Sequence, residues 1–297
     1  IFILSFQNNF MKILIIGGSQ FIGPLIIDKL VERNHDVTVF NRGRTKSEYN
    51  NVKFIQGDRR NGFNIKDYFD VVIDTCAYKG DHTKKAINEL NFDFYLHVST
   101  AASYKKTTKF PLTEESELGD WPLWNSVWSG YNKGKVECEK VLQESNIKYA
   151  SIRPVYILGK ENNFNRESFI YSRLKKNLPL VIPGDGQSKV QFVFAQDVTD
   201  SIVLLAERKL QGNFNCCNDD VVTLEKLVKE MAKIVGVIPI IKFNSKADGE
   251  KHNLQEFPFA NETFYCTNDK LKKLGIKFTS LVNGLKEDYE NYYKRII

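Results

Sequence analysis

Apolar and polar residues follow two alternating patterns in the first half of the chain. Short, nearly unbroken apolar runs, typical of strands buried on both faces, are separated by stretches in which apolar residues recur at helical spacing. The expected strands are residues 11–16, 36–42, 52–58, 70–75 and 94–100, and the clearest helices are residues 25–31 and 82–90. Strands that alternate with helices predict an α/β fold with a parallel sheet, whose ligands bind at the carboxyl ends of the strands.

The first apolar run ends in a glycine-rich turn, Gly17-Gly18-Ser19-Gln20-Phe21-Ile22-Gly23, which leads into the first helix. Such a junction aims free backbone N–H groups and the positive end of a helix dipole at one point, which suits a diphosphate. Gly17 would permit the sharp turn, Gly18 close approach of the backbone, and Gly23 close packing of helix on strand. A plain tight turn in some α/β protein is the alternative, so this motif alone decides little.

The second expected strand ends in Asn41-Arg42-Gly43-Arg44, where a dinucleotide fold reads the ribose of its cofactor. Chains that bind NAD usually have an acidic residue there, whereas guanidinium groups without a carboxylate suit a 2′-phosphate. Asn41 and Arg42 therefore predict NADP, with NAD as the alternative, although both arginines also fit solvated loop positions. Asp58, after the third strand, would accept a hydrogen bond from the adenine amino group, but an aspartate after glycine is also a common turn former.

Thr100, Tyr131 and Lys135 carry the candidate chemistry. Tyr131 and Lys135 are four residues apart, so they share one face of the helix expected there. A phenol with a pKa of about 10 is a poor base at neutral pH, and a neighbouring ammonium group lowers that pKa. Tyr131 would then exchange a proton with a substrate hydroxyl that Thr100 hydrogen-bonds, while Lys135 also holds the nicotinamide ribose. The alternative is a surface Tyr–Lys pair, which the position of the pair after a glycine turn disfavours.

Composition changes this picture little. The 42 basic and 36 acidic residues give a net charge of +6, which permits a polyanionic partner without requiring one. Cysteines at positions 76, 138, 216, 217 and 266 show no metal-ligand spacing, and neither do the four histidines, so we expect no metal site and a reduced, cytoplasmic protein. Residues 1–10 are apolar but too short to span a bilayer, and we expect them to be an extension before Met11, with no membrane association.

Taken together, these motifs resemble the NAD-dependent epimerase/dehydratase family of extended and atypical short-chain dehydrogenases/reductases. The resemblance extends over nearly the whole chain from Met11 onwards, and is specific for the superfamily but not for a substrate. Besides the glycine turn and Tyr131 with Lys135, it includes Gly57-Asp58, residues 98–104, Ile152-Arg153-Pro154 through Gly159, residues 183–186, residues 192–198 and residues 212–215.

The resemblance implies a Rossmann-type, doubly wound domain at residues 11–155 and a smaller substrate lobe at 156–297, partly interleaved with it. It implies that Thr100 rather than Ser99 supplies the catalytic hydroxyl. The implied activity is oxidoreduction, epimerisation or dehydration at a hydroxyl or keto carbon of a nucleotide sugar. The sequence leaves open whether the chain pairs with itself as a homodimer. The implied cofactor contacts are the seven residues of the glycine turn, Asn41, Arg42, Asp58, Thr75, Ser99, Tyr131, Lys135 and Pro154.

Three departures from the family pattern keep a second interpretation open. Gln20 replaces a glycine, Asp74-Thr75-Cys76-Ala77 replaces a small apolar stretch beside the cofactor, and Asp81 replaces an asparagine. Gln20, with the segment from Asn41 to Arg44, resembles an atypical branch that includes chloroplast stem-loop-binding proteins. The alternative function is therefore an RNA-binding or regulatory protein that keeps the cofactor fold as a scaffold or redox sensor, using basic residues such as Lys105, Lys106 and Lys109.

The substrate lobe gives weaker signals. Trp121, Trp124 and Trp128 fall in one segment before Tyr131, where they would stack on a base or sugar, close over the site, or simply pack against one another. Lys189, Gln191 and Arg166 are candidates for contact with a diphosphate, with plain surface positions as the alternative.

Overall fold

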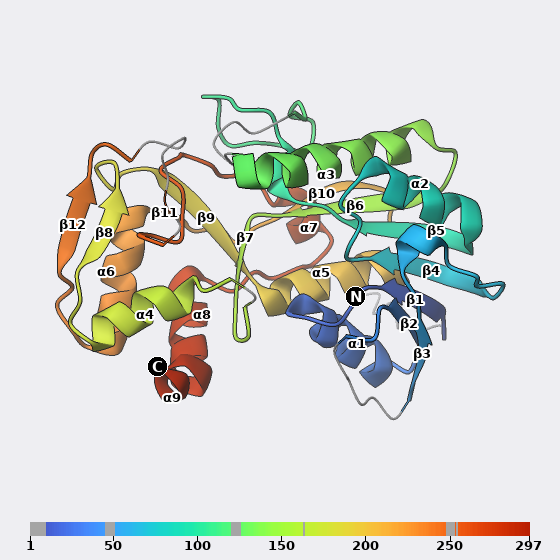
Figure 1. The fold of residues 1–297 in the computed structure, drawn as a ribbon, viewed down its shortest axis with the longest axis horizontal. Coiled ribbons are helices and arrows are strands. Elements are labelled where there is room, and N and C mark those ends of the chain that lie inside the picture. Colours follow the sequence, from blue (N-terminus) through green and yellow to red (C-terminus); the bar gives the residue numbers. More distant parts are fainter. Residues whose placement is uncertain (1–9, 45–50, 120–125, 163, 248–252, 254) are drawn as a thin grey trace, which may run out of the picture. The chain divides into compact units, whose positions relative to one another are not determined.

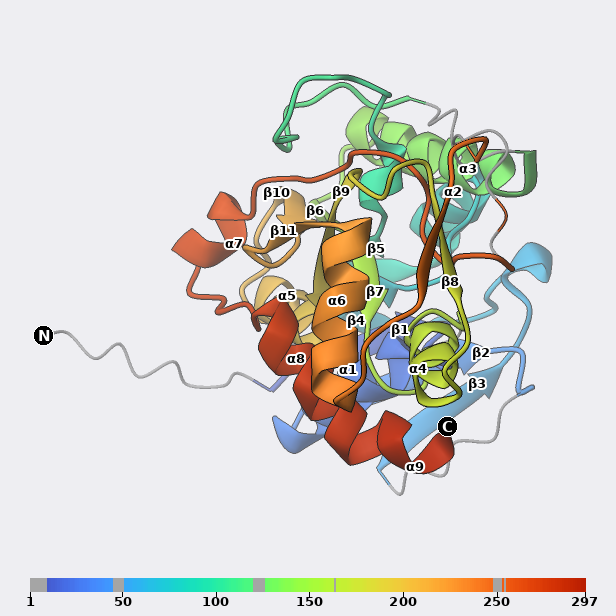
Figure 2. The same ribbon diagram turned by 90° about the vertical axis from the view of Figure 1, so that its left-hand side faces the viewer.

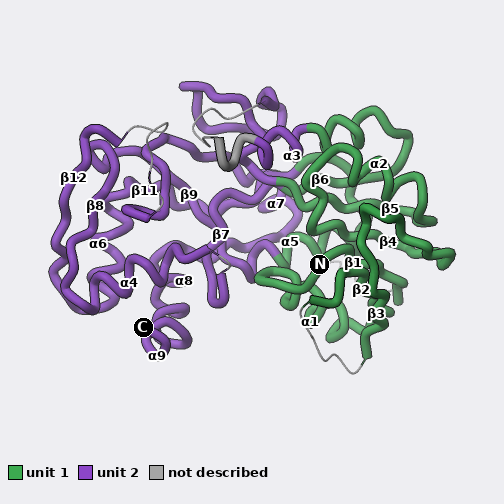
Figure 3. Tube along the Cα trace, in the orientation of Figure 1, with its two compact units in different colours: residues 1–99, 137–152, 199–213 green, residues 100–136, 153–198, 214–297 purple. Residues whose placement is uncertain are grey.

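Two compact units make up the chain in the computed structural model, which describes residues 10–44, 51–119, 126–162, 164–247, 253 and 255–297. Unit 1 consists of residues 1–99, 137–152 and 199–213, and unit 2 of residues 100–136, 153–198 and 214–297 (Figure 3). This division differs from the boundary expected near residue 155, because residues 100–136 belong to unit 2 and residues 199–213 to unit 1. Residues 1–9 of the expected extension lie outside the described residues.

A seven-stranded sheet has the order β10-β6-β5-β4-β1-β2-β3, and the pairings among β1 to β6 are parallel. This strand order confirms the Rossmann-type, doubly wound α/β fold. The strands are β1 (Lys12–Ile16), β2 (Asp36–Asn41), β3 (Val52–Gln56), β4 (Tyr68–Asp74), β5 (Asn91–Val98), β6 (Tyr149–Pro154) and β10 (Gly212–Cys216).

Helices cover both faces of the sheet (Figures 1 and 2). On one face α1 (Ile22–Glu32) lies beside α5 (Ala195–Glu207), where Lys29 pairs with Asp200 and Arg33 with Glu207. On the other, α2 (Gly80–Glu89) approaches the unit 1 part of α3 (Ser126–Glu144), and a Cβ on Gly80 would lie 3.2 Å from the Cβ of Glu137. The two clearest helical patterns of the sequence, residues 25–31 and 82–90, are therefore confirmed.

The strand register brings the ends of β1, β2 and β4 to one edge of the sheet. Ile16 lies opposite Phe40 on one side and Asp74 on the other. The segments that follow these strands are the glycine turn, Asn41-Arg42, and Thr75-Cys76. Two short 3₁₀ helices, η1 (Arg59–Asn61) and η2 (Ala101–Ser103), follow β3 and β5.

Unit 2 has its own hydrophobic core, which includes Tyr171, Phe192, Phe259 and Leu285. Two small sheets, ordered β11-β9-β7 and β12-β8, accompany several helices. These elements are β7 (Tyr156–Leu158), α4 (Glu167–Lys175), β8 (Leu180–Pro183), β9 (Lys189–Phe194), β11 (Val221–Thr223), α6 (Leu224–Val235), β12 (Ile241–Asn244), α7 (Asp269–Lys273), α8 (Leu281–Asp288), the π-helical turn η3 (Tyr289–Tyr293) and α9 (Lys294–Ile296).

The sequence also predicts a helix start at residues 223–227 and a helix over residues 198–207 capped by Asp197. The first is confirmed, because α6 begins at Leu224 and the Thr223 hydroxyl caps it by accepting from the Lys226 N–H. The expectation that Asp197 caps a helix is wrong, because α5 already begins at Ala195. The Asp197 carboxylate instead accepts from the N–H of Thr279 at 2.8 Å and from its hydroxyl at 2.9 Å.

Within the described ranges, no helix has the length and apolar character needed to cross a bilayer.

Candidate functional site

The first strand–helix junction of unit 1 requires glycine at three positions. Gly17 and Gly18 have φ angles of 101° and 74°, which residues with a Cβ rarely adopt. A Cβ on Gly23 would lie 2.5 Å from the Gly18 carbonyl carbon, so only glycine lets α1 pack this closely against the turn. Phe21, just before the helix, also has a positive φ of 53°, which for a bulky residue marks a turn under strain.

The start of α1 leaves backbone donors available. Among the residues that the structure describes, the amide N–H groups of Gln20, Phe21 and Ile22 have no hydrogen-bonding partner. Unsatisfied amides and the helix dipole together give this turn a positive character. The residues present therefore fit the diphosphate of a dinucleotide, although Gln20 stands where a smaller residue is usual.

Thr75 holds the turn in this shape. Its hydroxyl donates to the Ile16 carbonyl at 2.9 Å and accepts from the Gly18 N–H at 3.2 Å. Its own backbone N–H donates to the same Ile16 carbonyl at 3.0 Å. Thr75 thus fixes the end of β4 against the end of β1, whereas its contact with a cofactor stays a prediction.

Asn41 and Arg42 leave β2 beside the glycine turn. The Asn41 side chain donates to the Gly17 carbonyl at 3.4 Å and accepts from the Gly43 N–H at 2.8 Å, which bends the chain after the strand. Arg42 is exposed, and its carbonyl accepts from the Gln56 side chain at 3.3 Å. The exposed guanidinium of Arg42 therefore lies one residue from a side chain that contacts the turn.

Asp58 is engaged within its own segment. Its carboxylate accepts from the Arg60 backbone N–H at 3.0 Å and from the Arg60 guanidinium at 2.6 Å, and it caps η1. These hydrogen bonds, with the charges of Arg60 and Arg42, hold the pKa of Asp58 well below its usual range. The turn-forming interpretation thus describes what Asp58 does in this structure, and contact with adenine stays a prediction.

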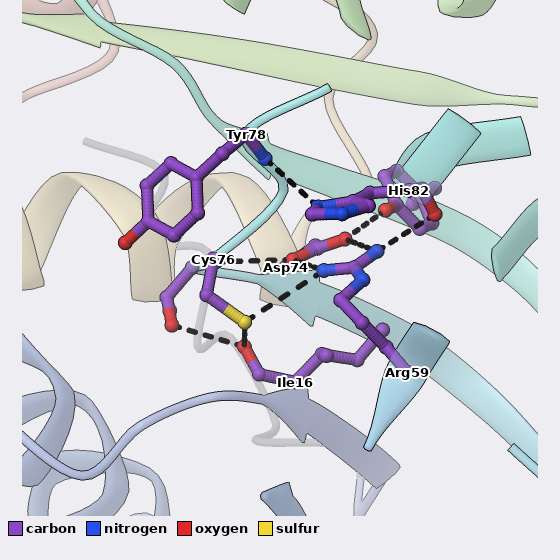
Figure 4. A network of polar contacts seen from close by, with 8 residues as sticks. Ile16, Arg59, Asp74, Cys76, Tyr78 and His82 are labelled. Atoms are coloured by element: carbon purple, nitrogen blue, oxygen red, sulfur yellow. Dashed lines mark hydrogen bonds and ion pairs between the residues drawn. The ribbon is translucent and has the colours of Figure 1, made fainter. Parts of the chain in front are cut away.

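A buried ion pair lies beneath this edge of the sheet (Figure 4). Arg59 donates to both oxygens of Asp74 at 2.8 and 2.7 Å and to the His82 carbonyl at 2.8 Å, and the Tyr95 hydroxyl also donates to Asp74. Burial alone would raise the pKa of Asp74, but the charge and hydrogen bonds of Arg59 and the bond from Tyr95 hold it well below its usual range. The carboxylate at the end of β4 is therefore ionised and fully paired.

Cys76 joins this network to the glycine turn. Its thiol lies 3.5 Å from the Ile16 carbonyl oxygen and 3.7 Å from an Arg59 nitrogen, and its backbone N–H donates to Asp74 at 3.1 Å (Figure 4). A Cβ on Gly17 would lie 2.4 Å from the Thr75 hydroxyl and 3.1 Å from the Cys76 sulfur. All five cysteines are free thiols.

Ser99 follows β5 directly, and its hydroxyl donates to the Glu139 carboxylate of α3 at 2.5 Å. Both side chains are buried. The hydroxyl of Ser99 is therefore committed to the protein, and contact of this residue with a cofactor stays a prediction.

Thr100, Tyr131 and Lys135 all belong to unit 2. Thr100 caps η2, and its Oγ1 accepts from the Ala102 N–H at 3.2 Å, so its hydroxyl proton is not used in that bond. Tyr131 and Lys135 lie on α3 as predicted, with the Lys135 ammonium nitrogen 5.8 Å from the centre of the Tyr131 ring. Lys135 is only 2% exposed, and a buried ammonium group beside a half-buried phenol supports proton exchange at that phenol.

Arg153, just before Pro154 at the end of β6, organises a second buried cluster. It donates to the Tyr104 hydroxyl at 2.9 Å and to the Glu114 carbonyl at 3.0 Å, and the Tyr104 hydroxyl donates to Asn215 at 2.6 Å. The cluster fixes the segment that follows η2. Pro154 is buried, and its expected cofactor contact stays a prediction.

The sequence did not single out Arg59 or Glu139, and gave Asp74 only as part of a departure from the family pattern. The one signal for Asp74 was a carboxylate at the end of an apolar run, which implies a buried partner.

Trp121, Trp124 and the side chain of Trp128 lie outside the described residues. Lys105 and Lys106 lie 2.9 Å from Glu117 and 3.8 Å from Glu262, so both basic charges have acidic neighbours.

Known proteins resemble this chain in sequence and in fold. A model of the NAD dependent epimerase/dehydratase family matches residues 13–86 and 82–217. The chloroplast stem-loop binding protein of 41 kDa b from Arabidopsis thaliana is 30% identical over 304 residues, which cover 94% of this chain and 78% of that protein.

Solved structures of two epimerases share the fold at 18% identity. The UDP-N-acetylglucosamine 4-epimerase from Methanobrevibacter ruminantium M1, in complex with UDP-N-acetylmuramic acid, has a TM-score of 0.79 and covers 96% of this chain and 99% of its own. The UDP-glucuronic acid 4-epimerase from Bacillus cereus, in complex with NAD, has a TM-score of 0.74 and covers 96% of this chain and 97% of its own.

Proposed function

We propose that this chain is an enzyme, because it belongs to the NAD-dependent epimerase/dehydratase family. The proposed enzyme acts on a hydroxyl or keto carbon of a nucleotide sugar by epimerisation, dehydration or oxidoreduction. The observation that carries this proposal is Tyr131 on α3, with the buried ammonium of Lys135 nearby. Two solved structures that share this fold are epimerases of UDP sugars by name, which supports the substrate class.

A nicotinamide dinucleotide is the proposed cofactor, and when bound it accepts or donates hydride. Its diphosphate would be held by the free amides of Gln20, Phe21 and Ile22 at the start of α1. The NAD in the Bacillus cereus structure supports this class of cofactor. The remaining cofactor contacts expected from the sequence are part of this proposal.

NADP is proposed in preference to NAD because of Arg42. This guanidinium is exposed one residue after Asn41, and no carboxylate follows β2 at this point. Arg42→Ala should weaken NADP binding about tenfold or more while leaving NAD binding within about twofold. Equal affinities of the variant and the unchanged protein for NADP would remove Arg42 from this role.

Tyr131 would exchange a proton with the reacting hydroxyl, and Thr100 would donate its free hydroxyl proton to the same oxygen. Lys135 would favour the phenolate and hold the nicotinamide ribose. A cytoplasmic location and a homodimer remain predictions from the sequence.

The first experiment is titration of the purified chain with NAD(H) and NADP(H), followed by tryptophan fluorescence. Micromolar binding of either pair would support the proposal and justify assays with UDP sugars and that cofactor. Binding of neither would contradict it.

RNA binding is the second candidate, favoured by one observation: the stem-loop binding relative is 30% identical over 94% of this chain. The acidic neighbours of Lys105 and Lys106 weaken the case for a basic surface at that segment. RNA binding predicts retention of a stem-loop RNA whose affinity falls steeply with added salt. Salt-sensitive RNA binding together with failure to bind either cofactor would make this candidate the better one.

A further inference from the structure

Arg166 lies in unit 2, just before α4, among aromatic rings. Its guanidinium carbon is 4.8 Å from the ring centre of Phe164, 4.9 Å from that of Tyr156 and 5.9 Å from that of Phe259. Tyr156 and Phe259 are buried, whereas Phe164 is exposed. Cation–π attraction to three rings fixes the position of the guanidinium without using its N–H groups.

The N–H groups of this guanidinium are unused. Within the described part of the chain, the Arg166 guanidinium has no hydrogen bond or ion pair with an oxygen. By contrast, Arg59 and Arg153 each donate to oxygen atoms nearby. A guanidinium group has five donors in a planar fork, which suits two oxygens of a carboxylate or phosphate.

Glu167, the next residue, does not neutralise Arg166. Its two oxygens accept from the Gly159 N–H at 2.7 Å and from the Asn162 side chain at 3.2 Å. Burial raises the pKa of Glu167 to about 7, so near neutral pH this carboxyl is protonated for a large part of the time. The positive charge of Arg166 is therefore not matched by a firmly ionised neighbour.

Arg166 and the candidate acid–base residue Tyr131 belong to the same unit. Burial lowers the pKa of the Arg166 guanidinium, and Tyr156, Glu167 and Tyr131 act in the opposite direction. The cation held by the aromatic rings, with its free donors, is thus part of the unit that carries the proposed acid–base residue.

We propose that Arg166 binds an oxyanion of the substrate, with its fork of N–H groups directed by the aromatic rings of Tyr156, Phe164 and Phe259. The oxyanion is either a phosphate of the nucleotide or a carboxylate on the sugar. This assignment rests on the proposed function, because the oxyanion must belong to a molecule that reacts near Tyr131. It makes Arg166 a residue that determines which substrates bind.

Calorimetric titration of the full chain tests the assignment with three probes: UDP-N-acetylglucosamine, UDP-glucuronic acid and inorganic pyrophosphate. The variants are Arg166→Gln and Arg166→Lys, and Arg173→Gln is the matched control. Arg173 lies on α4 with its guanidinium carbon 4.5 Å from the Phe169 ring centre, but it donates to the Pro179 carbonyl at 3.3 Å. Circular dichroism checks that each variant folds.

Arg166→Gln should lower the affinity for each probe that carries the recognised oxyanion about 10- to 100-fold, and the Arg173→Gln control should change each affinity less than about twofold. Lower affinity for all three probes would identify a phosphate as the bound oxyanion. Lower affinity for UDP-glucuronic acid alone would identify the carboxylate. Arg166→Lys should restore part of the loss because it keeps the charge without the fork. If Arg166→Gln does not fold, a loss of affinity in Arg166→Lys relative to the unchanged protein tests the assignment.

Two results would overturn the assignment: unchanged binding of every probe by the folded Arg166 variants, or binding of none by the unchanged protein. The second result would also contradict the proposed function. Binding of pyrophosphate that depends on Arg166, without binding of either UDP sugar, would contradict the proposed substrate class and leave the oxyanion site standing.

Discussion

Ser99 donates its hydroxyl proton to Glu139 across 2.5 Å, and both side chains are shielded from solvent. The bond joins the residue after β5 to the middle of α3, two elements separated by forty positions along the chain. Thr100 follows Ser99, and Lys135 lies four positions, about one helical turn, before Glu139. This buried bond therefore ties the end of β5 to the part of α3 that belongs to unit 1.

Ser99→Ala should destabilise the protein, because the buried Glu139 carboxylate would lose a donor. Loss of one hydrogen bond to a charged group predicts a decrease of about 1–3 kcal/mol in the free energy of unfolding. Urea unfolding monitored by circular dichroism measures the change. Ser116→Ala is the control, since Ser116 lies in a more exposed turn, where its hydroxyl accepts from the Thr113 N–H. Equal stability of Ser99→Ala and the unchanged protein would mean that this bond contributes nothing net.

Gly23→Ala should weaken dinucleotide binding. The new Cβ would meet the Gly18 carbonyl carbon at 2.5 Å, and because the neighbour is backbone, the turn itself must shift. Titration with NADP(H) and NAD(H) should show at least a tenfold loss of affinity. Gly130→Ala provides the control, because nothing lies within 4 Å of a Cβ at that position. Cofactor affinity that survives Gly23→Ala would show that the turn does not hold the diphosphate.

Tyr131→Phe should lower kcat about 10²- to 10⁴-fold, the usual contribution of a positioned proton donor or acceptor. Cofactor affinity should change little, because the ring and the Lys135 ammonium remain. Turnover with the identified UDP sugar, compared with cofactor titration of the same sample, separates the two effects. Turnover equal to that of the unchanged protein would remove Tyr131 as the acid–base residue.

Stability should fall as pH rises through neutrality because of Glu167. Burial raises its folded-state pKa from an ordinary value of 4.5 to about 7, so the folded chain keeps a proton that the unfolded chain has lost. The stabilising contribution is complete below about pH 4.5 and is lost as pH rises through about 7. Glu167→Gln should remove this dependence, which amounts to up to roughly 3 kcal/mol between pH 5 and 8.

Urea midpoints at several pH values measure this dependence. Asp288 contributes in the same direction, because burial raises its pKa to about 6, so Asp288→Asn must be measured separately. If the urea midpoint of Glu167→Gln changes with pH as that of the unchanged protein does, the loss of stability arises from other groups.

Local patterns predicted those parts of the fold that depend on neighbouring residues. Apolar runs and glycines located β1, its turn and α1, and four-residue spacing placed Tyr131 and Lys135 on α3. The limits of β5 were less accurate, since it spans Asn91–Val98 rather than residues 94–100. Its polar start pairs with β4, where Tyr68 lies opposite Asn91, and hydropathy carries no signal for such pairing.

Side-chain partnerships across the sequence could not be predicted. Asp74 at the end of an apolar run implies a buried cation, but nothing in the sequence identifies that cation as Arg59. The sequence favoured a plain surface position for Arg166, because its contact with Phe259 joins residues far apart in the chain. Such contacts follow from tertiary packing, which periodicity does not encode.

The division of each unit into three stretches of chain constrains how this protein can be altered or can have diversified. No single cut separates one unit from the other, so a truncation at any point from residue 101 to residue 212 removes part of both. Recombination that exchanges unit 2 between relatives would have to replace its three stretches of chain together. Substitution of single residues keeps the interleaved connection intact, so it is the simpler way to alter one unit and preserve the other.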